Sequence, residues 1–142
     1  MISKIIRTSL FLILFSCGKD YSKTCKTYEC RKKSMIVELV PNSIYLGEVS
    51  QLRVRRIAFF LPKMRVFIGE YDENFNLPNG VEKQYFTGTD SLATMNLYPK
   101  TEGIKKVKGI IEEYQFISKD SIDSYRYYFE VELNVIDTVQ SI

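Results

Sequence analysis

An alternation of apolar and polar residues near the C-terminus is the feature that most restricts the fold of this chain. Between residues 125 and 135, apolar or aromatic side chains occupy every second position. These positions are Tyr125, Tyr127, Phe129, Val131, Leu133 and Val135. Because successive side chains of a β-strand point to opposite faces, this period predicts a strand with one face on a core and one in water. Such half-covered strands are typical of antiparallel sheets.

Shorter segments of strand-forming residues precede this one, and turn-forming residues separate them. We expect strands at residues 35–40, 52–55, 64–71, 81–86, 92–98 and 104–116. Asn79-Gly80 is a strong hairpin signal, and the longest segment needs a bend or bulge, which we place near Gly109. After the first 20 residues no segment has a helical period. About seven short strands with frequent turns predict an all-β, antiparallel sandwich.

The first 20 residues have the layout of a secretory signal peptide. Lys4 and Arg7 make the start basic, an apolar run is densest over residues 10–15, and the small Ser16 precedes Cys17. The apolar run is far shorter than the roughly 20 residues that cross a bilayer. A cleaved signal is therefore expected. The alternatives are an uncleaved N-terminal anchor and an ordinary signal that is cut elsewhere.

Within this segment, Leu14-Phe15-Ser16-Cys17 resembles the lipobox of bacterial lipoproteins. Leu14, Ser16 and Cys17 fit the family pattern, and Phe15 stands where a smaller residue is usual. In that family the cysteine thiol receives a diacylglyceryl group, the chain is cut before the cysteine, and the new amine is acylated. The resemblance implies lipidation at Cys17 and a lipid anchor in the envelope of a gram-negative bacterium. We expect the outer membrane, on its periplasmic side or at the cell surface.

These features divide the chain into three parts. Residues 1–16 form the signal peptide, residues 17–33 the lipidated N-terminus and a flexible tether, and residues 34–142 the β-sandwich domain. The tether is expected because residues 17–33 are polar and charged and show no apolar periodicity.

The mature part resembles bacterial immunoglobulin-like domains in architecture. The segment 97–103 is similar to the E–F corner of those domains, and the segment 40–47 is similar to their first strand and turn. Ile104 stands about where a corner tyrosine would be expected. The resemblance implies an immunoglobulin-like sandwich and carries no activity with it.

The charge balance gives no support to nucleic-acid binding. The whole chain has 20 Lys+Arg and 17 Asp+Glu, a formal net charge of +3. Removal of Lys4 and Arg7 with the signal leaves 18 basic residues against 17 acidic ones. Because the mature chain is nearly neutral, we expect no nucleic-acid partner.

Catalysis is not expected either. The chain has no histidine, which removes the commonest general base and any Ser-His or Cys-His nucleophile. Glu112 and Glu113 project to opposite faces of one strand and cannot form a dyad there. Glu130 and Glu132 lie on the polar face of the last strand. Since the sequence gives no carboxylate a reason to be desolvated, we expect no enzyme and no cofactor.

Asp72-x-Asn74-x-Asn76 begins like a calcium-binding loop. The EF-hand pattern then requires Gly at its sixth position and Glu at its twelfth, where this chain has Leu77 and Lys83. A lysine at the bidentate position opposes a cation. We therefore expect ordinary Asn/Asp turn chemistry and no metal site.

The cysteine count suggests a disulfide. With Cys17 lipidated, Cys25 and Cys30 remain as an even pair in an oxidising compartment. They form either a disulfide that closes a short loop or two free thiols. A metal site is disfavoured because there is no histidine and no second cysteine pair.

Two groups of side chains are candidates for binding. Arg53 and Arg55 share one face of their strand and would form a partner-binding patch if the neighbouring strand placed Arg65 beside them. The alternative is a solvated outer face that discourages edge pairing. The tyrosines near loops or on polar faces suit recognition of proteins or sugars, although aromatic residues also fill cores. These are Tyr71, Tyr85, Tyr98 and Tyr128.

The function expected from these observations is that of a membrane-anchored, non-enzymatic module. Its sandwich would bind an envelope protein or serve a structural role. The alternative is a lipoprotein that binds a glycan or a small nutrient through exposed tyrosines. A flat patch or an exposed edge strand would favour a protein partner, and a concave site with aromatic side chains would favour a small ligand.

Overall fold

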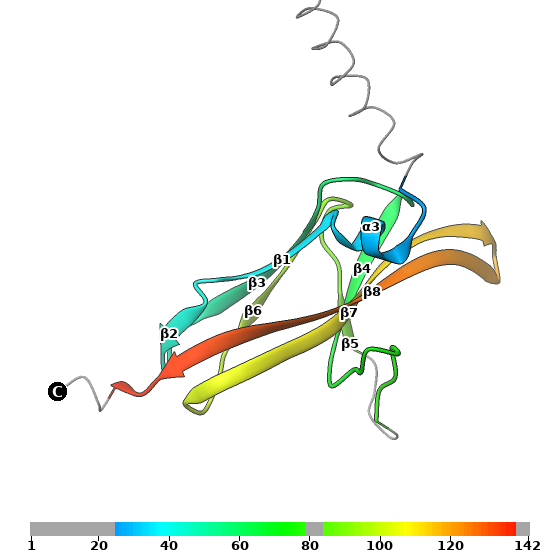
Figure 1. Cartoon of the computed structure of the whole chain (residues 1–142). Coiled ribbons are helices and arrows are strands. Elements are labelled where there is room, and N and C mark those ends of the chain that lie inside the picture. The colour runs from blue at the N-terminus through cyan, green and yellow to red at the C-terminus, as the bar shows by residue number, and fades with distance from the viewer. Residues whose placement is uncertain (1–24, 79–83, 139–142) are drawn as a thin grey trace, which may run out of the picture.

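In this computed structural model the structure is described for residues 25–78 and 84–138. These residues form one short helix and eight strands (Figure 1). The elements are α3 (Tyr28–Lys32), β1 (Met35–Val40), β2 (Ser43–Tyr45), β3 (Ser50–Arg56), β4 (Lys63–Ile68), β5 (Gln84–Phe86), β6 (Leu92–Leu97), β7 (Gly103–Ser118) and β8 (Ser121–Ile136). The predicted all-β class is confirmed.

The strands form two sheets. One has three strands in the order β1-β3-β6, and the other has five in the order β2-β8-β7-β4-β5. Neighbouring strands are antiparallel except β2, which runs parallel to β8 at residues 43–45. The sequence did not predict β2. Of the predicted strand at 81–86, the described part forms β5, while residues 81–83 and the Asn79-Gly80 turn lie outside the described residues.

The core lies between the two sheets and confirms the alternation predicted for the last strand. In β8 the side chains of Tyr127, Phe129 and Leu133 are buried, whereas Arg126 and Glu130 on the other face are exposed. The other sheet contributes Leu39, Leu52, Val54 and Ala93 to the same core. Each fully buried large apolar side chain contributes about 1.5–3 kcal/mol relative to exposure, so this interface holds the sheets together.

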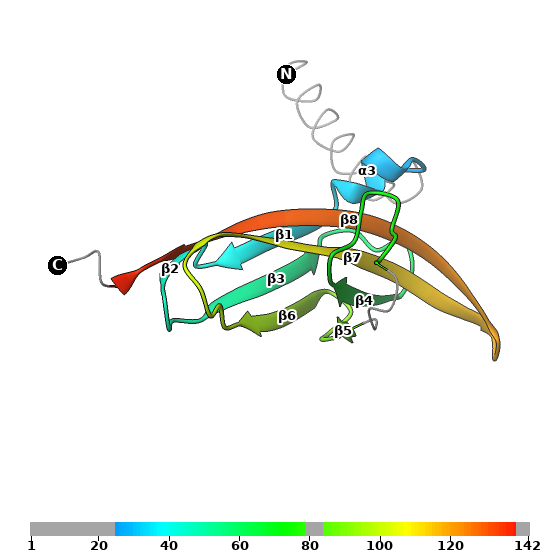
Figure 2. The same cartoon turned by 90° about the horizontal axis from the view of Figure 1, so that it is seen from below.

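Strands β7 and β8 form a hairpin of two 16-residue strands that extends past the rest of its sheet (Figure 2). Strand β4 pairs with β7 only from Gly109 to Tyr114. Within the described part of the chain, the two strands beyond that point pair only with each other. We term residues 115–124 the arm.

We predicted a bend or bulge near Gly109, and the structure has no bulge there. The β7–β8 register is continuous from Gly103 to Phe116, and its irregularity lies between Phe116 and Ser118. A Cβ at Gly109 would lie 2.2 Å from the Phe67 carbonyl oxygen and 2.6 Å from Cζ of Phe129. The glycine is therefore needed because β4 and an aromatic ring approach the β7 backbone closely.

The structure also differs from the prediction of a tether through residue 33. Residues 17–24 lie outside the described part, but from Cys25 onward the chain is folded. A disulfide joins Cys25 to Cys30, and the Thr27 side chain accepts a hydrogen bond of 3.2 Å from the Cys30 N–H at the start of α3. A disulfide and a helix cap both limit the conformations of a short segment.

Helix α3 packs against the inner face and edge of β8. The Tyr28 ring stacks on the Tyr127 ring at 5.8 Å, and the Tyr28 hydroxyl accepts a 3.2 Å hydrogen bond from the Tyr128 N–H. The Arg31 guanidinium lies 4.0 Å from the centre of the Tyr125 ring. Helix α3 is thus held on β8 by the ring of Tyr28 and the guanidinium of Arg31. A search of the sequence for apolar periodicity does not detect such contacts.

Candidate functional site

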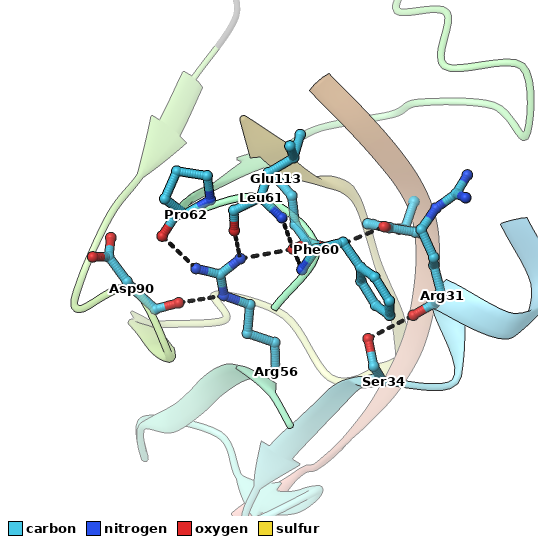
Figure 3. A network of polar contacts seen from close by, with 9 residues as sticks. Arg31, Ser34, Arg56, Phe60, Leu61, Pro62, Asp90 and Glu113 are labelled. Atoms are coloured by element: carbon cyan, nitrogen blue, oxygen red, sulfur yellow. Dashed lines mark hydrogen bonds and ion pairs between the residues drawn. The ribbon is translucent and has the colours of Figure 1, made fainter. Parts of the chain in front are cut away.

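A buried polar cluster joins the two sheets through Arg56 and Glu113 (Figure 3). On β3, Leu52 and Val54 face the core, and Arg56 continues their register inward. Both charged side chains have no exposed surface, and their Nη1 and Oε2 atoms are 2.7 Å apart.

Three main-chain carbonyls surround the Arg56 guanidinium. Its Nη1 donates to the Leu61 oxygen at 2.6 Å and its Nη2 to the Pro62 oxygen at 2.7 Å. Its Nε donates to the Asp90 carbonyl. One guanidinium therefore binds both the segment after β3, at residues 61–62, and the segment before β6, at residue 90.

Both oxygens of the Glu113 carboxylate accept hydrogen bonds. Its Oε2 accepts from the N–H groups of Phe60 and Leu61 at 3.0 and 3.2 Å, and its Oε1 accepts from the Tyr127 hydroxyl at 2.8 Å. Burial and the adjacent Glu113 charge raise the pKa of Tyr127. Hydrogen-bond donors thus occupy both carboxylate oxygens of Glu113. We therefore interpret the cluster as a structural link between the two sheets.

A second polar cluster lies on the opposite face of β7. The loop after β4 folds over this outer face, across β7 and β8 (Figure 2). Beneath the loop is a cavity of about 310 Å³, which we term the outer pocket. Its lining residues are Arg65, Phe67, Tyr71, Phe75, Tyr85, Ile110, Glu112 and Arg126.

Glu112 is the buried centre of this pocket, with 1% of its side chain exposed. Its Oε1 lies 2.5 Å from Arg65 Nη2, and its Oε2 accepts from Arg126 Nε at 2.9 Å. The two arginines are 27% and 51% exposed. Two guanidinium groups and one carboxylate leave the cluster with a net positive charge.

Aromatic side chains form the walls of the outer pocket. The rings of Phe67 and Tyr85 lie 5.7 Å apart, and the Arg65 guanidinium is 5.2 Å from the Phe67 ring. Tyr71 is 4% exposed, and its buried hydroxyl has no hydrogen-bond partner among residues 25–78 and 84–138. Burial raises the pKa of Tyr71, and the nearby Arg126 charge opposes that shift.

The loop over the pocket is held by turn chemistry. Asp72 Oδ1 accepts hydrogen bonds from the N–H groups of Asn74 and Asn76 at 2.9 and 3.0 Å, and these bonds lower the pKa of Asp72. Phe75 has a φ of +67°, a left-handed conformation that is uncommon for an aromatic residue. Lys83, the twelfth position of the loop compared with an EF-hand, lies outside the described residues.

A larger depression of about 840 Å³ follows the edge of β8 between α3, β1 and the loop. Apolar and aromatic residues line it together with Glu29, Glu73, Glu130 and Lys32. The Glu130 carboxylate accepts a hydrogen bond of 3.0 Å from the Tyr128 hydroxyl and lies 3.5 Å from Lys106 Nζ.

The structure does not bring the three predicted patch arginines together. Arg53 and Arg55 lie on β3 in the three-stranded sheet, and Arg65 lies on β4 in the five-stranded sheet. Arg53 donates to the Gln51 side chain at 2.7 Å, whereas Arg65 pairs with Glu112. The three arginines form no common patch because β3 and β4, although consecutive in sequence, are not paired and lie in different sheets.

The predicted tyrosines divide among three places. Tyr71 and Tyr85 meet at the outer pocket, and Tyr128 lines the larger depression. Tyr98 lies at a separate cavity of about 320 Å³. The lipidation candidate Cys17 lies outside the described residues.

The expectation that no carboxylate is desolvated is wrong for Glu112 and Glu113, both with 0% of the residue exposed. The signal for Arg56 was present in the sequence, because it continues the inward alternation of Leu52 and Val54. The two glutamates carried no such signal. Adjacent positions on a strand are both buried only when both faces of the sheet are covered, and here a loop covers the outer face.

The fold and these sites define an all-β protein of two packed sheets with an inner ion pair and a polar outer pocket. A scan of protein-family models, a search of curated proteins and a search of solved structures each found no match to this chain. Among the described residues, no helix is long and apolar enough to span a membrane.

Proposed function

We propose that this protein is a lipid-anchored module of the gram-negative cell envelope that binds another envelope protein and catalyses no reaction. The resemblance of Leu14–Cys17 to a lipobox supports the anchor, which would lie in the outer membrane. The sandwich would be of the immunoglobulin-like type suggested by the segment 97–103. The exposed apolar side chains of the arm carry the proposal of a protein partner.

The arm presents large apolar side chains to solvent. Phe116 is 62% exposed, Ile117 67% and Ile122 38%. Phe116 pairs in register with Ile122, so these two side chains are cross-strand neighbours. An exposed apolar group on a projecting ribbon is costly in water and is typical of a surface that a partner covers.

A protein suits the arm better than a lipid surface. Asp120 and Asp123 lie at or near its tip with a single base, Lys119, and anionic headgroups would repel the acidic residues. Beyond Tyr114, the outer edge of β7 has no strand partner within the described residues. Such an edge can add a strand from another protein, which supplies main-chain hydrogen bonds and side-chain contacts together.

Photo-crosslinking in cells tests the arm. A photoreactive residue at position 117 of the full chain should give a discrete protein adduct. The same residue at position 104 should not. Ile104 is the matched control because it lies on the same strand and is 66% exposed. The adduct should disappear when Phe116→Ser is added. Equal labelling from both positions, or adducts to phospholipid from position 117, would contradict a protein partner.

Lipid anchoring has a separate test. Cys17→Ala should abolish incorporation of labelled fatty acid and release the protein from the membrane fraction, because the thiol that receives the lipid is gone. Several acyl chains anchor stably, since each buried methylene contributes about 0.8 kcal/mol. Cys30→Ala serves as the control and should retain the label. Unchanged membrane attachment of the Cys17 variant would show that the lipoprotein assignment is wrong.

The second candidate function is binding of a glycan or a small nutrient. The observation that favours it is the meeting of Tyr71 and Tyr85 at the outer pocket. A concave site with aromatic walls and a few polar groups is the usual form of a small-molecule site.

A further inference from the structure

We propose that the outer pocket binds a small monocarboxylate whose acid group is attached to a single ring, with the carboxylate held by Arg126 and the Tyr71 hydroxyl. This inference rests on the second candidate function and names its ligand class. It is independent of the arm, which lies elsewhere on the hairpin.

Arg126 has hydrogen-bond donors that its ion pair with Glu112 does not use. Its Nε donates to Glu112 Oε2 at 2.9 Å, which leaves its two Nη groups as further donors. A planar guanidinium that is anchored on one side can present its other donors to a carboxylate in the preferred paired geometry. The half-exposed side chain remains accessible to a ligand.

The Tyr71 hydroxyl is buried without a hydrogen-bond partner among the described residues. A buried polar group without a hydrogen bond is disfavoured, and such groups are rare in folded proteins. Tyr71 lines the same cavity as Arg126. Burial raises the pKa of Tyr71, and the positive charge of Arg126 acts to lower it. A ligand oxygen near both groups would accept one hydrogen bond from the phenol and one or more from the guanidinium.

The walls of the outer pocket suit a ring as the part of the ligand that carries the acid. Phe67, Phe75 and Tyr85 give the cavity aromatic walls, and Tyr85 is 60% exposed at its mouth. Aromatic faces pack on flat rings and on the apolar faces of sugars. The volume of about 310 Å³ is at the lower limit of the roughly 300–1,000 Å³ of small-molecule sites, which favours a single ring.

The net charge of Arg65, Arg126 and Glu112 favours a ligand with one negative charge over a ligand with two. Arg65 and Arg126 together exceed Glu112 by one charge, so one carboxylate neutralises the pocket. A doubly charged phosphate would meet the buried Glu112 carboxylate as well as the arginines. The acid could be carried by an aromatic ring or by a sugar ring, and the two share the same recognition chemistry.

The experiment is a binding titration of the mature full chain in detergent micelles, followed by saturation-transfer NMR and calorimetry. The probes are benzoate and glucuronate, with benzamide and glucose as their neutral counterparts and inorganic phosphate as a dianion. We expect saturation of the ring protons of benzoate, glucuronate or both, and little or none for benzamide and glucose. Phosphate has no ring protons and is followed by calorimetry, where we expect little or no binding. The acid that binds more tightly identifies the source. Equal binding of the neutral probes, tighter binding of phosphate, or no binding of either acid would overturn the proposal.

Two variants test the assigned residues. Arg126→Gln should weaken binding about tenfold or more, because a charge-assisted contact is lost. Tyr71→Phe should weaken it several-fold without lowering the melting temperature, since the hydroxyl has no partner to lose in the unliganded protein. Lys106→Gln removes a 58% exposed base from the same outer face and should bind as the unaltered chain does. If neither variant of the pocket changed the affinity, the site assignment would be refuted, while the crosslinking result for the arm would stand unaffected.

Discussion

Replacing Glu113 with glutamine should lower the free energy of unfolding by about 3–5 kcal/mol. The substitution keeps the shape of the side chain and removes its charge. Arg56 carries a positive charge and has no exposed surface. The variant therefore keeps a buried cation and loses the carboxylate that is paired with it. A small domain has a total stability of about 5–15 kcal/mol, so the loss should be large enough to shift the whole unfolding curve.

Denaturant titration followed by far-UV circular dichroism measures this loss. Glu130→Gln is the matched control, because it changes the same residue type in an exposed ion pair with Lys106. We expect the unfolding midpoint of the control to stay close to that of the unaltered protein. A Glu113→Gln midpoint equal to that of the control would contradict the buried pair.

A double-mutant cycle separates the ion pair from the rest of the cluster. Arg56→Met alone should also destabilise, because it leaves the Glu113 charge buried and removes donors from three carbonyls. Adding Glu113→Gln to Arg56→Met removes the remaining charge. The double variant should therefore lose less stability than the sum of the two single losses. Additive losses would show that the two charges do not interact.

Replacing Gly109 with alanine should lower the free energy of unfolding by about 3 kcal/mol, at the upper end of the usual cost of an overpacked core. The added methyl group would overlap the Phe67 carbonyl oxygen, which belongs to the neighbouring strand, and the Phe129 ring. The ring can move, but the carbonyl oxygen cannot move without displacing β4.

Two further variants of this chain serve as controls for Gly109→Ala. The double variant Gly109→Ala/Phe129→Leu relieves only the ring contact and should recover little stability. Lys106→Ala on the same strand is exposed and should have a small effect. If Gly109→Ala unfolded at the midpoint of the unaltered protein, the close approach of β4 would be wrong, and a bulge at this position would again explain the glycine.

Sequence reasoning was most successful where the information is local. The inward and outward faces of β8 follow from the alternation of Tyr127 and Phe129 with Arg126 and Glu130, and the structure agrees. The same local rule placed Glu112 and Glu113 on opposite faces, and their partners do lie on opposite sides of β7. Alternation is a property of the extended backbone, so it can be read without knowing any neighbour.

Sequence reasoning failed where a side chain depends on a distant segment. Arg65 was grouped with Arg53, but β4 joined a different sheet and found Glu112. Helix α3 was expected to belong to a tether, because the residues that dock it, Tyr28 and Arg31, are polar by composition. Their ring and guanidinium faces are half-buried against Tyr127 and Tyr125, which β8 presents to them.

The amino-acid order by itself determined the all-β class, the faces of the strands and the inward position of Arg56, because each follows from backbone geometry over a few residues. The tertiary structure alone decided that Glu112 and Glu113 are buried, that Tyr71 meets Arg126 in one pocket, and that Gly109 must lack a side chain. These outcomes depend on which strands become neighbours and on where the loop after β4 lies. That choice is made by packing of the whole core, and no short stretch of the sequence contains it.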